Sequence, residues 1–407
     1  MFVRCCGITA LSRALNIGKR MEKKYKVAYI SGTRADYGIV RKYLKFLSKD
    51  ERIVLDILVT GAHLDERFGH TVDVIRNDGF NIEEFPIHIN NESTSGVIAS
   101  MSEAILYFGN HFQNHKYDLV ILLGDRYEIL SASIAAGMQK NKILHFHGGE
   151  ITLGNYDEFI RHSITKISTF HFTATEEYRK RVIQLGEDPE RVFNMGSLGA
   201  ENAREIQEDK VEQKILALPK DGYFTVLYHP ETLTDSNVLE EANTILSAMS
   251  KYSDTHKIVL LGSNADTGGN LISQAFMKKA QTDKSFMYFE SLSPESYLYL
   301  VKNSLVLIGN SSSGIIEAPS LGNYTINIGR RQDGRIRASS VLDVNCTKEE
   351  IDCAISKVME MKKAQIQIVN PYFKENAAQN CYYKTLELLA REEREPKRFF
   401  DLFFNEY

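Results

Sequence analysis

Short apolar runs alternate with segments of helical spacing along most of the chain. The run 117–125 (YDLVILLGD) and its counterparts are bounded by turn residues, and several are too uniformly apolar for a strand with one face in water. Helix-like segments lie between the runs, so the pattern predicts βαβ units and a doubly wound parallel sheet. In the first half of the chain, strands are expected at 26–32, 53–61, 117–125, 142–149, 169–175 and 191–197.

The pattern pauses in a polar segment that glycine and proline interrupt (196–222), and then begins again. The second set of expected strands is 223–230, 257–263, 285–291, 304–310 and 324–329. Two similar halves predict an α/β protein with two Rossmann-like, doubly wound domains that face a cleft. We expect an extension outside the fold (1–20), an N-terminal domain (21–200), a C-terminal domain (201–370), and a last element (371–407) whose long helix, at 371–393, packs across both domains.

Composition limits the classes of partner. At 407 residues, 43% hydrophobic, 25% charged and a net charge of −4, the chain exceeds one ordinary core and gives no electrostatic reason to expect nucleic acid. Its five cysteines lack Cys/His ligand spacing, which is typical of a reducing compartment without structural zinc. No apolar run approaches the roughly 18 residues that span a membrane. We therefore expect a cytoplasmic protein with no membrane partner, no metal and no cofactor.

A serine-rich turn carries the strongest ligand signal. Residues 309–322 (GNSSSGIIEAPSLG) follow an expected strand and lead into a helical segment. Small residues let backbone N–H groups point at an anion, and the helix start adds about half a positive charge. The alternative is a plain capping turn. The signal predicts a diphosphate held by Ser311, Ser312, Ser313 and Gly314, with Glu317 accepting hydrogen bonds from ribose hydroxyls.

Basic residues follow three other expected strands. Arg34 lies in the turn 31–38 (SGTRADYG), His229 follows the first strand of the second half, and Arg330, Arg331 and Arg335 lie in 329–335 (GRRQDGR). Each alone is typical of a solvated surface charge. Together with the serine turn they predict a nucleotide diphosphate site. The dinucleotide GxGxxG fingerprint, the Walker loop and the GxSxG elbow are all absent from the sequence.

Acidic residues and histidines gather after two strands of the N-terminal half. Several carboxylates in one cleft would raise each other's pKa, so that one could act as an acid while another acts as a base. Asp157 and Glu158 start a helical segment, so that helix capping is their alternative role. The candidate acid/base residues are Asp125, His147, Glu150 and Asp157, with Glu158, Arg161 and His162 beside them.

With these motifs in this order, the chain resembles the hydrolysing UDP-N-acetylglucosamine 2-epimerases of the bacterial sialic-acid pathway. The resemblance rests on eight segments that span nearly everything from residue 26 to the C-terminal helix. They are 31–38 (SGTRADYG), 59–69 (VTGAHLDERFG), 123–128 (LGDRYE), 145–150 (HFHGGE), 157–168 (DEFIRHSITKIS), 229–232 (HPET), 309–322 and 326–335 (INIGRRQDGR).

The resemblance implies a fold of the glycosyltransferase-B type and a homodimer or homotetramer. The catalytic acids of the family match Asp125 and Asp157. The UDP-binding residues of the family match Arg34, His229, Ser311, Ser312 and Glu317. We also expect sugar or phosphate contacts from His63, Glu158, Arg161, His162 and Arg331.

One position departs from the family pattern. Where many relatives read His-Ile-Glu-Gly-Gly-Glu, this chain has His147 in place of the first glutamate. Either His147 takes over the acid/base role, which imidazole can do near neutral pH, or Glu150 does.

The expected reaction converts UDP-N-acetylglucosamine and water to N-acetylmannosamine and UDP, through elimination to a glycal and rehydration, and supplies sialic acid for surface polysaccharide. Several alternatives stay open. They are the same reaction on UDP-2,4-diacetamido-2,4,6-trideoxyglucose, a non-hydrolysing 2-epimerase, a glycosyltransferase, and a catalytically silent sugar-nucleotide sensor.

Overall fold

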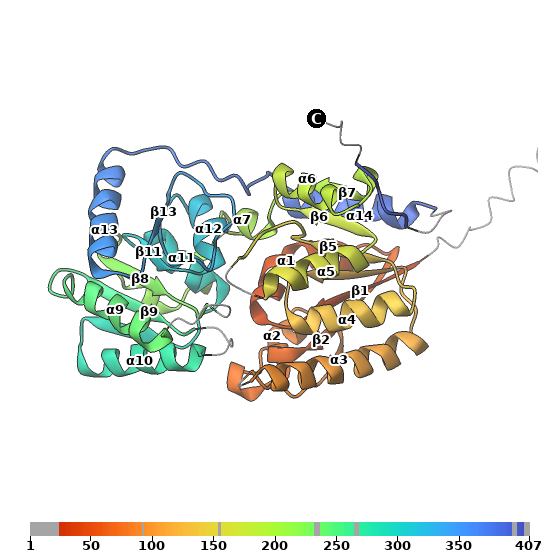
Figure 1. Cartoon of the computed structure of the whole chain (residues 1–407), viewed down its shortest axis with the longest axis horizontal. Coiled ribbons are helices and arrows are strands. Elements are labelled where there is room, and N and C mark those ends of the chain that lie inside the picture. Colours follow the sequence, from red (N-terminus) through yellow and green to blue (C-terminus); the bar gives the residue numbers. More distant parts are fainter. Residues whose placement is uncertain are drawn as a thin grey trace, which may run out of the picture.

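The computed structural model describes residues 24–91, 93–153, 156–231, 237–263, 268–392 and 397–402. They form two α/β domains, each built on a parallel sheet with helices on both faces (Figure 1). The first sheet has the order β3-β2-β1-β4-β5-β6-β7 and the second the order β10-β9-β8-β11-β12-β13. This confirms the prediction of two doubly wound domains. The expected extension 1–20 lies outside the described residues.

The strands of the first sheet are β1 (Tyr25–Ser31), β2 (Ile53–Thr60), β3 (Asn81–Phe85), β4 (Leu119–Leu123), β5 (Ile143–Phe146), β6 (Phe170–Thr173) and β7 (Val192–Asn194). Those of the second are β8 (Tyr223–Leu227), β9 (Lys257–Leu261), β10 (Phe286–Phe289), β11 (Leu307–Gly309), β12 (Thr325–Ile328) and β13 (Val341–Val344).

The helices between the strands of the first sheet, together with the short helix that follows them, are α1 (Arg34–Ser48), α2 (Val72–Asn77), α3 (Thr94–Asn114), α4 (Tyr127–Met138), α5 (Asp157–Ile167), α6 (Glu176–Gln184) and α7 (Leu198–Asn202). The later helices are α8 (Gln213–Leu216), α9 (Val238–Ser250), α10 (Gly269–Thr282), α11 (Pro294–Asn303), α12 (Ser312–Ile316), α13 (Lys348–Lys363) and α14 (Ala377–Ala390).

Each sheet is buried on both faces, which explains its continuous apolar runs. In β1, Val27 and Tyr29 pack with α1 on one face, whereas Ala28 and Ile30 pack with α3 and α4 on the other. All four are fully buried, and a buried aliphatic or aromatic side chain contributes about 1.5–3 kcal/mol. The two cores fix the strand ends, and therefore the turns that follow them.

Two strands, β3 and β13, were not predicted. Both are edge strands, and most of their side chains are only partly buried or exposed. In β3 the sequence NIEEF therefore carries two glutamates where a central strand would carry apolar residues. The apolar pattern predicts central strands and misses edges of this kind.

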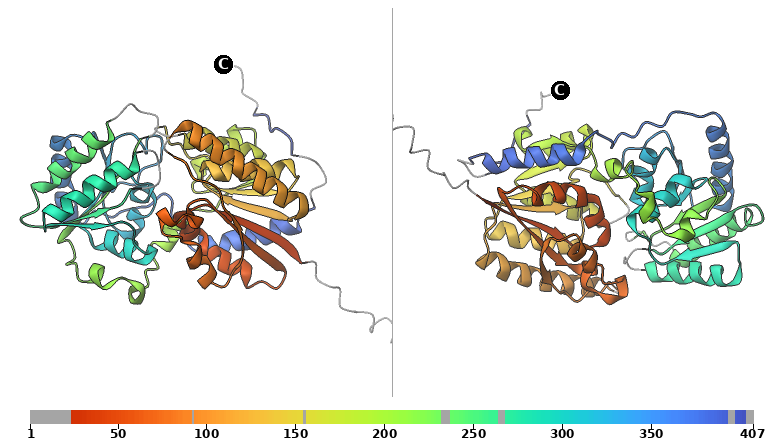
Figure 2. Two further views of the ribbon diagram at one scale, coloured as in Figure 1. Left: turned by 90° about the horizontal axis from the view of Figure 1, so that it is seen from below. Right: turned by 180° about the vertical axis from the view of Figure 1, so that it is seen from behind.

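The C-terminal helix α14 is shorter than predicted and packs on α1 and α7 of the N-terminal domain. The Tyr43 hydroxyl of α1 lies 2.8 Å from Thr385 Oγ1 of α14. Before this helix, the chain crosses from α13 in one domain to the other, as Figure 2 shows from behind. In that crossing, Asn370 Nδ2 donates to the Ile316 carbonyl of the C-terminal domain at 2.7 Å.

Candidate active site

Two adjacent strand ends of the first sheet, those of β4 and β5, carry the acidic cluster. Gly124 follows β4 with φ +85°, and Asp125 comes next. His147 follows β5 in the left-handed region, with φ +66°, and its N–H donates to the Phe172 carbonyl of β6 at 2.9 Å. His145 Nε2 lies 2.8 Å from the Gly124 carbonyl oxygen, so that it ties the two turns together. Asp125 and His147 are therefore held at one edge of the sheet.

Arg161 of α5 contacts both turns. Its side chain is 1% exposed, and it pairs through Nη2 with Asp125 Oδ2. Nη1 donates to the Glu150 backbone carbonyl at 2.9 Å and to Thr152 Oγ1 at 3.1 Å. A guanidinium with several fixed donors can hold a carboxylate and a loop at once. Arg161 thus organises the site.

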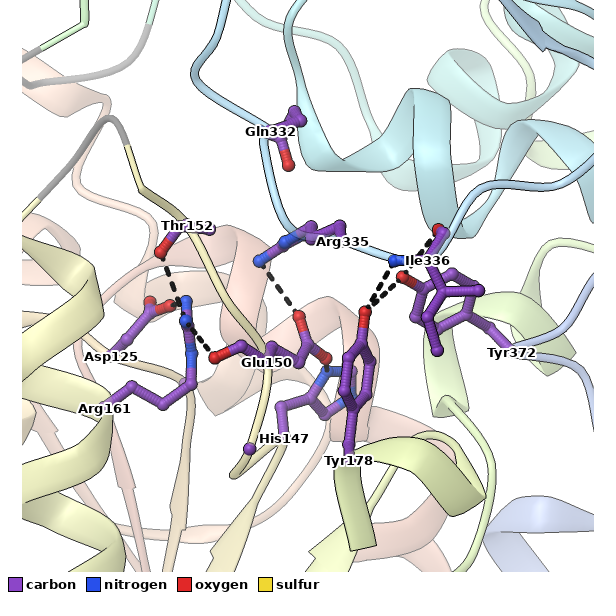
Figure 3. A network of polar contacts seen from close by, with 12 residues as sticks. Asp125, His147, Glu150, Thr152, Arg161, Tyr178, Gln332, Arg335, Ile336 and Tyr372 are labelled. Atoms are coloured by element: carbon purple, nitrogen blue, oxygen red, sulfur yellow. Dashed lines mark hydrogen bonds and ion pairs between the residues drawn. The ribbon is translucent and has the colours of Figure 1, made fainter. Parts of the chain in front are cut away.

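Glu150 is clamped from both domains (Figure 3). Its Oε1 lies 2.8 Å from His147 Nδ1, and its Oε2 lies 3.0 Å from Nη2 of Arg335 in the C-terminal domain. The Glu150 side chain is 1% exposed and that of Arg335 is 8% exposed. The ion pair between Glu150 and Arg335 therefore places the acidic cluster at the domain boundary.

The expected net rise in the pKa of these carboxylates is not found, because nearby cations outweigh the repulsion between Asp125 and Glu150. Burial alone would raise the pKa of Asp125, but Arg161 and Arg335 outweigh burial and lower it. Burial likewise opposes ionisation of Glu150, yet Arg335 and His147 lower its pKa to about 2. Both carboxylates are therefore ionised at neutral pH.

Further contacts join the domains beside this pair. The hydroxyls of Tyr178 and Tyr372 lie 2.7 Å apart, and the Ile336 N–H donates to the Tyr178 hydroxyl at 3.0 Å. Gly334 has φ +85°, and a Cβ on it would overlap the Ile151 side chain. The loops 147–153 and 329–337 are thus in direct contact.

On the C-terminal side, Asn310 connects three strand ends. It follows Gly309, where a Cβ would overlap the Leu227 carbonyl oxygen. Asn310 Oδ1 accepts from the His229 N–H and Nδ2 donates to the His229 carbonyl, both at 2.8 Å. The Asn310 carbonyl accepts from Gln332 Nε2 at 2.9 Å. The ends of β8 and β11 and the loop after β12 are fixed together in this way.

The serine turn combines capping with free donors. Ser311 caps α12, and the Ser313 hydroxyl donates to Ser311 Oγ at 3.0 Å and contacts the Tyr297 hydroxyl. Gly314 faces the sheet, because a Cβ there would lie 2.6 Å from Thr325 Cγ2. The hydroxyl of Ser312 has no hydrogen-bond partner within the described residues.

Glu317 follows α12 without a cation to balance it. In the part of the chain that the structure describes, no donor lies within hydrogen-bonding distance of its carboxylate. Withdrawal from water raises the pKa of Glu317 to about 7. A carboxylate left in this state retains its capacity to accept hydrogen bonds from a ligand.

Other candidate residues have more local partners. Arg34 Nη1 reaches Ser291 Oγ at 3.4 Å and lines a cavity of about 290 Å³ that Glu212 and Glu295 also line. Within the described residues, no hydrogen bond joins Arg34 to the serine turn. His63 is fully buried, with its ring nitrogens 2.9 Å from Ser31 Oγ and 2.8 Å from Thr71 Oγ1. Its position is that of a satisfied core histidine.

The start of α5 forms a smaller cluster. Glu158 Oε2 accepts from the Thr152 N–H at 2.6 Å, and Oε1 lies 3.1 Å from His162 Nε2. Burial opposes ionisation of Glu158, but His162 and the Thr152 N–H lower its pKa. Asp157, the first residue of α5, is half-buried. Arg331, in the other domain, donates from Nη1 to the Asn310 carbonyl at 3.4 Å.

Several residues of the site were not predicted in these roles. Asn310 and Arg335 stood in motifs, but no sequence signal indicates their contacts with His229 and Glu150. No sequence motif indicates Gln332, Tyr178 or Tyr372 as site residues, because their positions in the site depend on how the two domains pack. Within the described residues, the buried polar atoms of the site without a hydrogen-bond partner include Nε2 of His147, Nε and Nη1 of Arg335, and Oε1 of Gln332.

Within the described residues, no group of three or more His, Cys, Asp or Glu side chains is placed to hold a metal ion. Among the described helices, none combines the length and apolar character needed to cross a bilayer.

Comparison with known proteins places the chain in a family. Residues 45–384 match the family model described as UDP-N-acetylglucosamine 2-epimerase. The chain belongs to the UDP-N-acetylglucosamine 2-epimerase family.

Relatives in this family include the polysialic acid biosynthesis protein P7 of Escherichia coli, which is 47% identical over 93% of this chain and 97% of its own length. The GDP/UDP-N,N'-diacetylbacillosamine 2-epimerase (hydrolyzing) of Campylobacter jejuni is 36% identical over 82% of this chain and 88% of its own. The crystal structure of UDP-GlcNAc 2-epimerase from Neisseria meningitidis bound to UDP-GlcNAc has a TM-score of 0.75 at 19% identity. It covers 89% of this chain and 100% of that one, and shows the shared fold.

Proposed function

We propose that the protein is a hydrolysing 2-epimerase that converts UDP-N-acetylglucosamine and water to N-acetylmannosamine and UDP, for sialic acid biosynthesis. One observation carries the proposal: the buried network of Asp125, Arg161 and Glu150 meets Arg335, from the loop that also contacts the serine-turn residue Asn310. The residues proposed to act on the sugar therefore lie next to those proposed to hold the nucleotide diphosphate. The 47% identity to a polysialic acid biosynthesis protein supports the sialic acid route.

The first half of the reaction is an elimination. The C2 proton of a pyranose is not beside a carbonyl, so a side chain can remove it only as UDP departs and C1 gains oxocarbenium character. The electron pair of the C1–O bond leaves with UDP, and that of the C2–H bond forms the C1=C2 bond of a glycal. Ionised Asp125 would stabilise positive charge at the ring, as carboxylates do in glycosidases.

The second half is a hydration. Water adds at C1, and a proton returns to C2 from the face opposite to the one it left, so that C2 is inverted. The sugar is then free and UDP is the second product. Asp157, at the start of α5, is the remaining family acid that we assign to these proton transfers.

The serine turn of the C-terminal domain would hold UDP through neutral donors. The Ser312 hydroxyl and the backbone N–H groups of the serine turn would bind the diphosphate, and Glu317 would accept from ribose hydroxyls. Preorganised donors of this kind stabilise a departing anion. Arg331 and the side chain of His229, near the same strand ends, are further UDP contacts in this proposal.

A second candidate substrate has an observation in its favour. The Campylobacter jejuni relative, at 36% identity, is named as acting on a diacetylbacillosamine nucleotide. The same elimination and hydration on UDP-2,4-diacetamido-2,4,6-trideoxyglucose is therefore the alternative to be tested.

Proton NMR in D₂O separates these possibilities. The protein would be incubated with UDP-N-acetylglucosamine, without metal or acceptor sugar. The proposal predicts UDP and free N-acetylmannosamine with deuterium at C2. UDP-N-acetylmannosamine would instead indicate a non-hydrolysing epimerase, and UDP release without epimerisation would refute the mechanism. No reaction here, with turnover of the diacetamido sugar, would establish the alternative substrate.

A further inference from the structure

We propose that His147 is the base that takes the C2 proton, that Glu150 positions it, and that Arg335 from the C-terminal domain holds Glu150 in place. This inference rests on the proposed function and assigns roles that the family pattern leaves open at this position. Its first support is the state of Glu150. Both carboxylate oxygens are already occupied, one 2.8 Å from His147 Nδ1 and the other 3.0 Å from Arg335 Nη2. A carboxylate held in this way has little capacity to take up a proton.

The second support is the ring of His147. A carboxylate beside Nδ1 favours the tautomer in which Nδ1 carries the proton, so Nε2 of the neutral ring presents its lone pair. That Nε2 atom is buried and has no hydrogen-bond partner within the described residues. Native structures rarely leave a buried polar atom unpaired without a reason. The pairing of a carboxylate and an imidazole with one nitrogen free is the arrangement of a general base.

The third support is the backbone. His147 adopts φ +66°, a conformation that a residue with a side chain enters at a cost, and its N–H is fixed to the Phe172 carbonyl at 2.9 Å. In this turn the ring of His147 lies against the carboxylate of Glu150. Backbone strain of this kind is retained where the placement of a side chain matters.

The other histidines of the region differ from His147. The ring nitrogens of His145 lie 2.8 Å from the Gly124 carbonyl and 3.2 Å from Thr165 Oγ1, and burial lowers its pKa to about 3. His162 Nδ1 is also unpartnered, but its carboxylate partner Glu158 is 26% exposed and, among the described residues, has no contact with the C-terminal domain. His171 of β6 also lies 3.0 Å from a fully buried carboxylate, Glu187, and its Nδ1 has no partner within the described residues, but Glu187 is paired with Lys166 and Lys397. Of these four histidines, only His147 has a carboxylate partner that an arginine of the C-terminal domain holds.

The charged and titratable groups around the ring come from several elements. Glu150 lies on the same loop, Arg335 on the loop after β12, and Tyr178 on α6. Arg161 and Asp125 lie on the other side of the Glu150 backbone from the His147 ring. Glu150 stabilises an imidazolium at His147, whereas Arg335 opposes it. The two partners therefore act on the base with opposite sign.

In the proposed step, Nε2 of neutral His147 takes the C2 proton. The C2–H electrons form the C1=C2 bond while the C1–O electron pair leaves on UDP. The resulting imidazolium is balanced by Glu150.

A glycine substitution tests the base directly. Because glycine adopts φ +66° without strain, His147→Gly leaves the backbone relaxed and opens space for imidazole. We expect UDP release from UDP-N-acetylglucosamine to fall by at least about 10²-fold and to recover by about tenfold or more with added imidazole. His70→Gly is the matched control, since His70 is also left-handed, with φ +44°, but 43% exposed and far along the chain. UDP release by His70→Gly should stay at the wild-type rate and should not respond to imidazole.

The pH profile of kcat tests the two positioning residues. In Glu150→Gln the imidazolium loses its carboxylate, so the acid limb should move to lower pH. In Arg335→Gln a positive charge is removed, so the acid limb should move to higher pH. A purely structural role would lower kcat without these opposite displacements. Arg335→Lys keeps the charge and should leave the limb near the wild-type position, even if kcat falls.

The outcomes separate this inference from the proposed function. If the wild-type protein turns over the substrate, but His147→Gly does so at the wild-type rate or is not rescued by imidazole, His147 is not the base. If both acid limbs move in the same direction, the assigned positioning roles are wrong. Failure of the wild-type protein on both candidate sugars would instead refute the proposed function.

Discussion

The two clusters at the strand ends differ in how their polar groups are balanced. In the N-terminal domain, Asp125 and Glu150 are ionised and each is paired with an arginine. In the C-terminal domain, the serine turn offers hydroxyl and backbone donors, and its carboxylate, Glu317, has no cation beside it among the described residues. One side therefore has fixed charges, and the other has groups that a ligand can still satisfy.

This difference indicates a division of labour. Fixed charges cost little to reorganise during a reaction, which is how electrostatic stabilisation of a transition state works. Neutral donors and an unpaired acceptor bind a ligand without first breaking an ion pair. We infer that chemistry belongs to the first cluster and retention of UDP to the second, and the predictions below test that division.

The largest expected effect comes from breaking the buried charge network. Arg161→Met removes the partner of Asp125 at a side chain that is 1% exposed, and leaves a carboxylate and the Glu150 loop without a donor. We expect the free energy of unfolding to fall by about 3–5 kcal/mol, measured by urea denaturation. Arg330→Met removes a side chain that is 75% exposed, and should change the free energy of unfolding by less than about 0.5 kcal/mol. Equal effects would contradict the central place of Arg161.

The next effect is on turnover. Asp125→Asn keeps the shape of the side chain but removes the negative charge that would stabilise the sugar ring. We expect kcat for UDP release to fall by about 10²-fold or more, because a charged group of the transition state is lost. Asp333→Asn, on the domain-boundary loop but 33% exposed and paired with Arg330, should change kcat by less than about threefold. A D125N enzyme with the wild-type rate would remove Asp125 from the catalytic set.

A smaller effect is a pH dependence of binding. With the Glu317 pKa raised to about 7, the carboxyl is mainly protonated at pH 6 and mainly ionised at pH 8. The ionised form accepts more strongly from the ribose hydroxyls, so KM for the UDP-sugar should fall as pH rises, by about tenfold at most. Glu317→Gln should flatten this dependence in steady-state measurements. An unchanged pH dependence in the variant would place its origin elsewhere.

The smallest effect distinguishes two serines. Ser312→Ala removes a hydroxyl without a partner in the described structure and should raise KM a few-fold, by about 1 kcal/mol. Ser313→Ala removes a hydroxyl that already bonds Ser311 and Tyr297, so its effect should appear mainly in thermal stability. Reversed effects would show that the turn changes its hydrogen bonds when UDP binds.

Much of the fold could be predicted because the central strands are buried on both faces. β1 and β4 appear in the sequence as continuous apolar runs, whereas the edge strands β3 and β13 do not. A half-exposed edge strand with two glutamates resembles a loop in such a pattern. The central strand ends, and the turns that follow them, were thus predictable from local sequence.

The partners within the site were not predictable in the same way. A turn after a strand indicates that Asp125 and Glu150 reach one sheet edge, but not that Arg161 and Arg335 will lie against them. Arg335 meets Glu150 only through the packing of one domain on the other, at a separation of 185 positions in the chain. The wrong expectation of raised carboxylate pKa values followed from seeing the acids without their cations.

The division between the two clusters is tested most directly by the Kd of UDP for the Asp125→Asn variant, measured by titration calorimetry beside the wild-type protein. The account predicts a Kd within about twofold of the wild-type value, together with the loss of turnover, because no UDP contact is assigned to Asp125. A loss of UDP affinity as large as the loss of kcat would contradict it, since the acidic cluster would then hold the nucleotide as well.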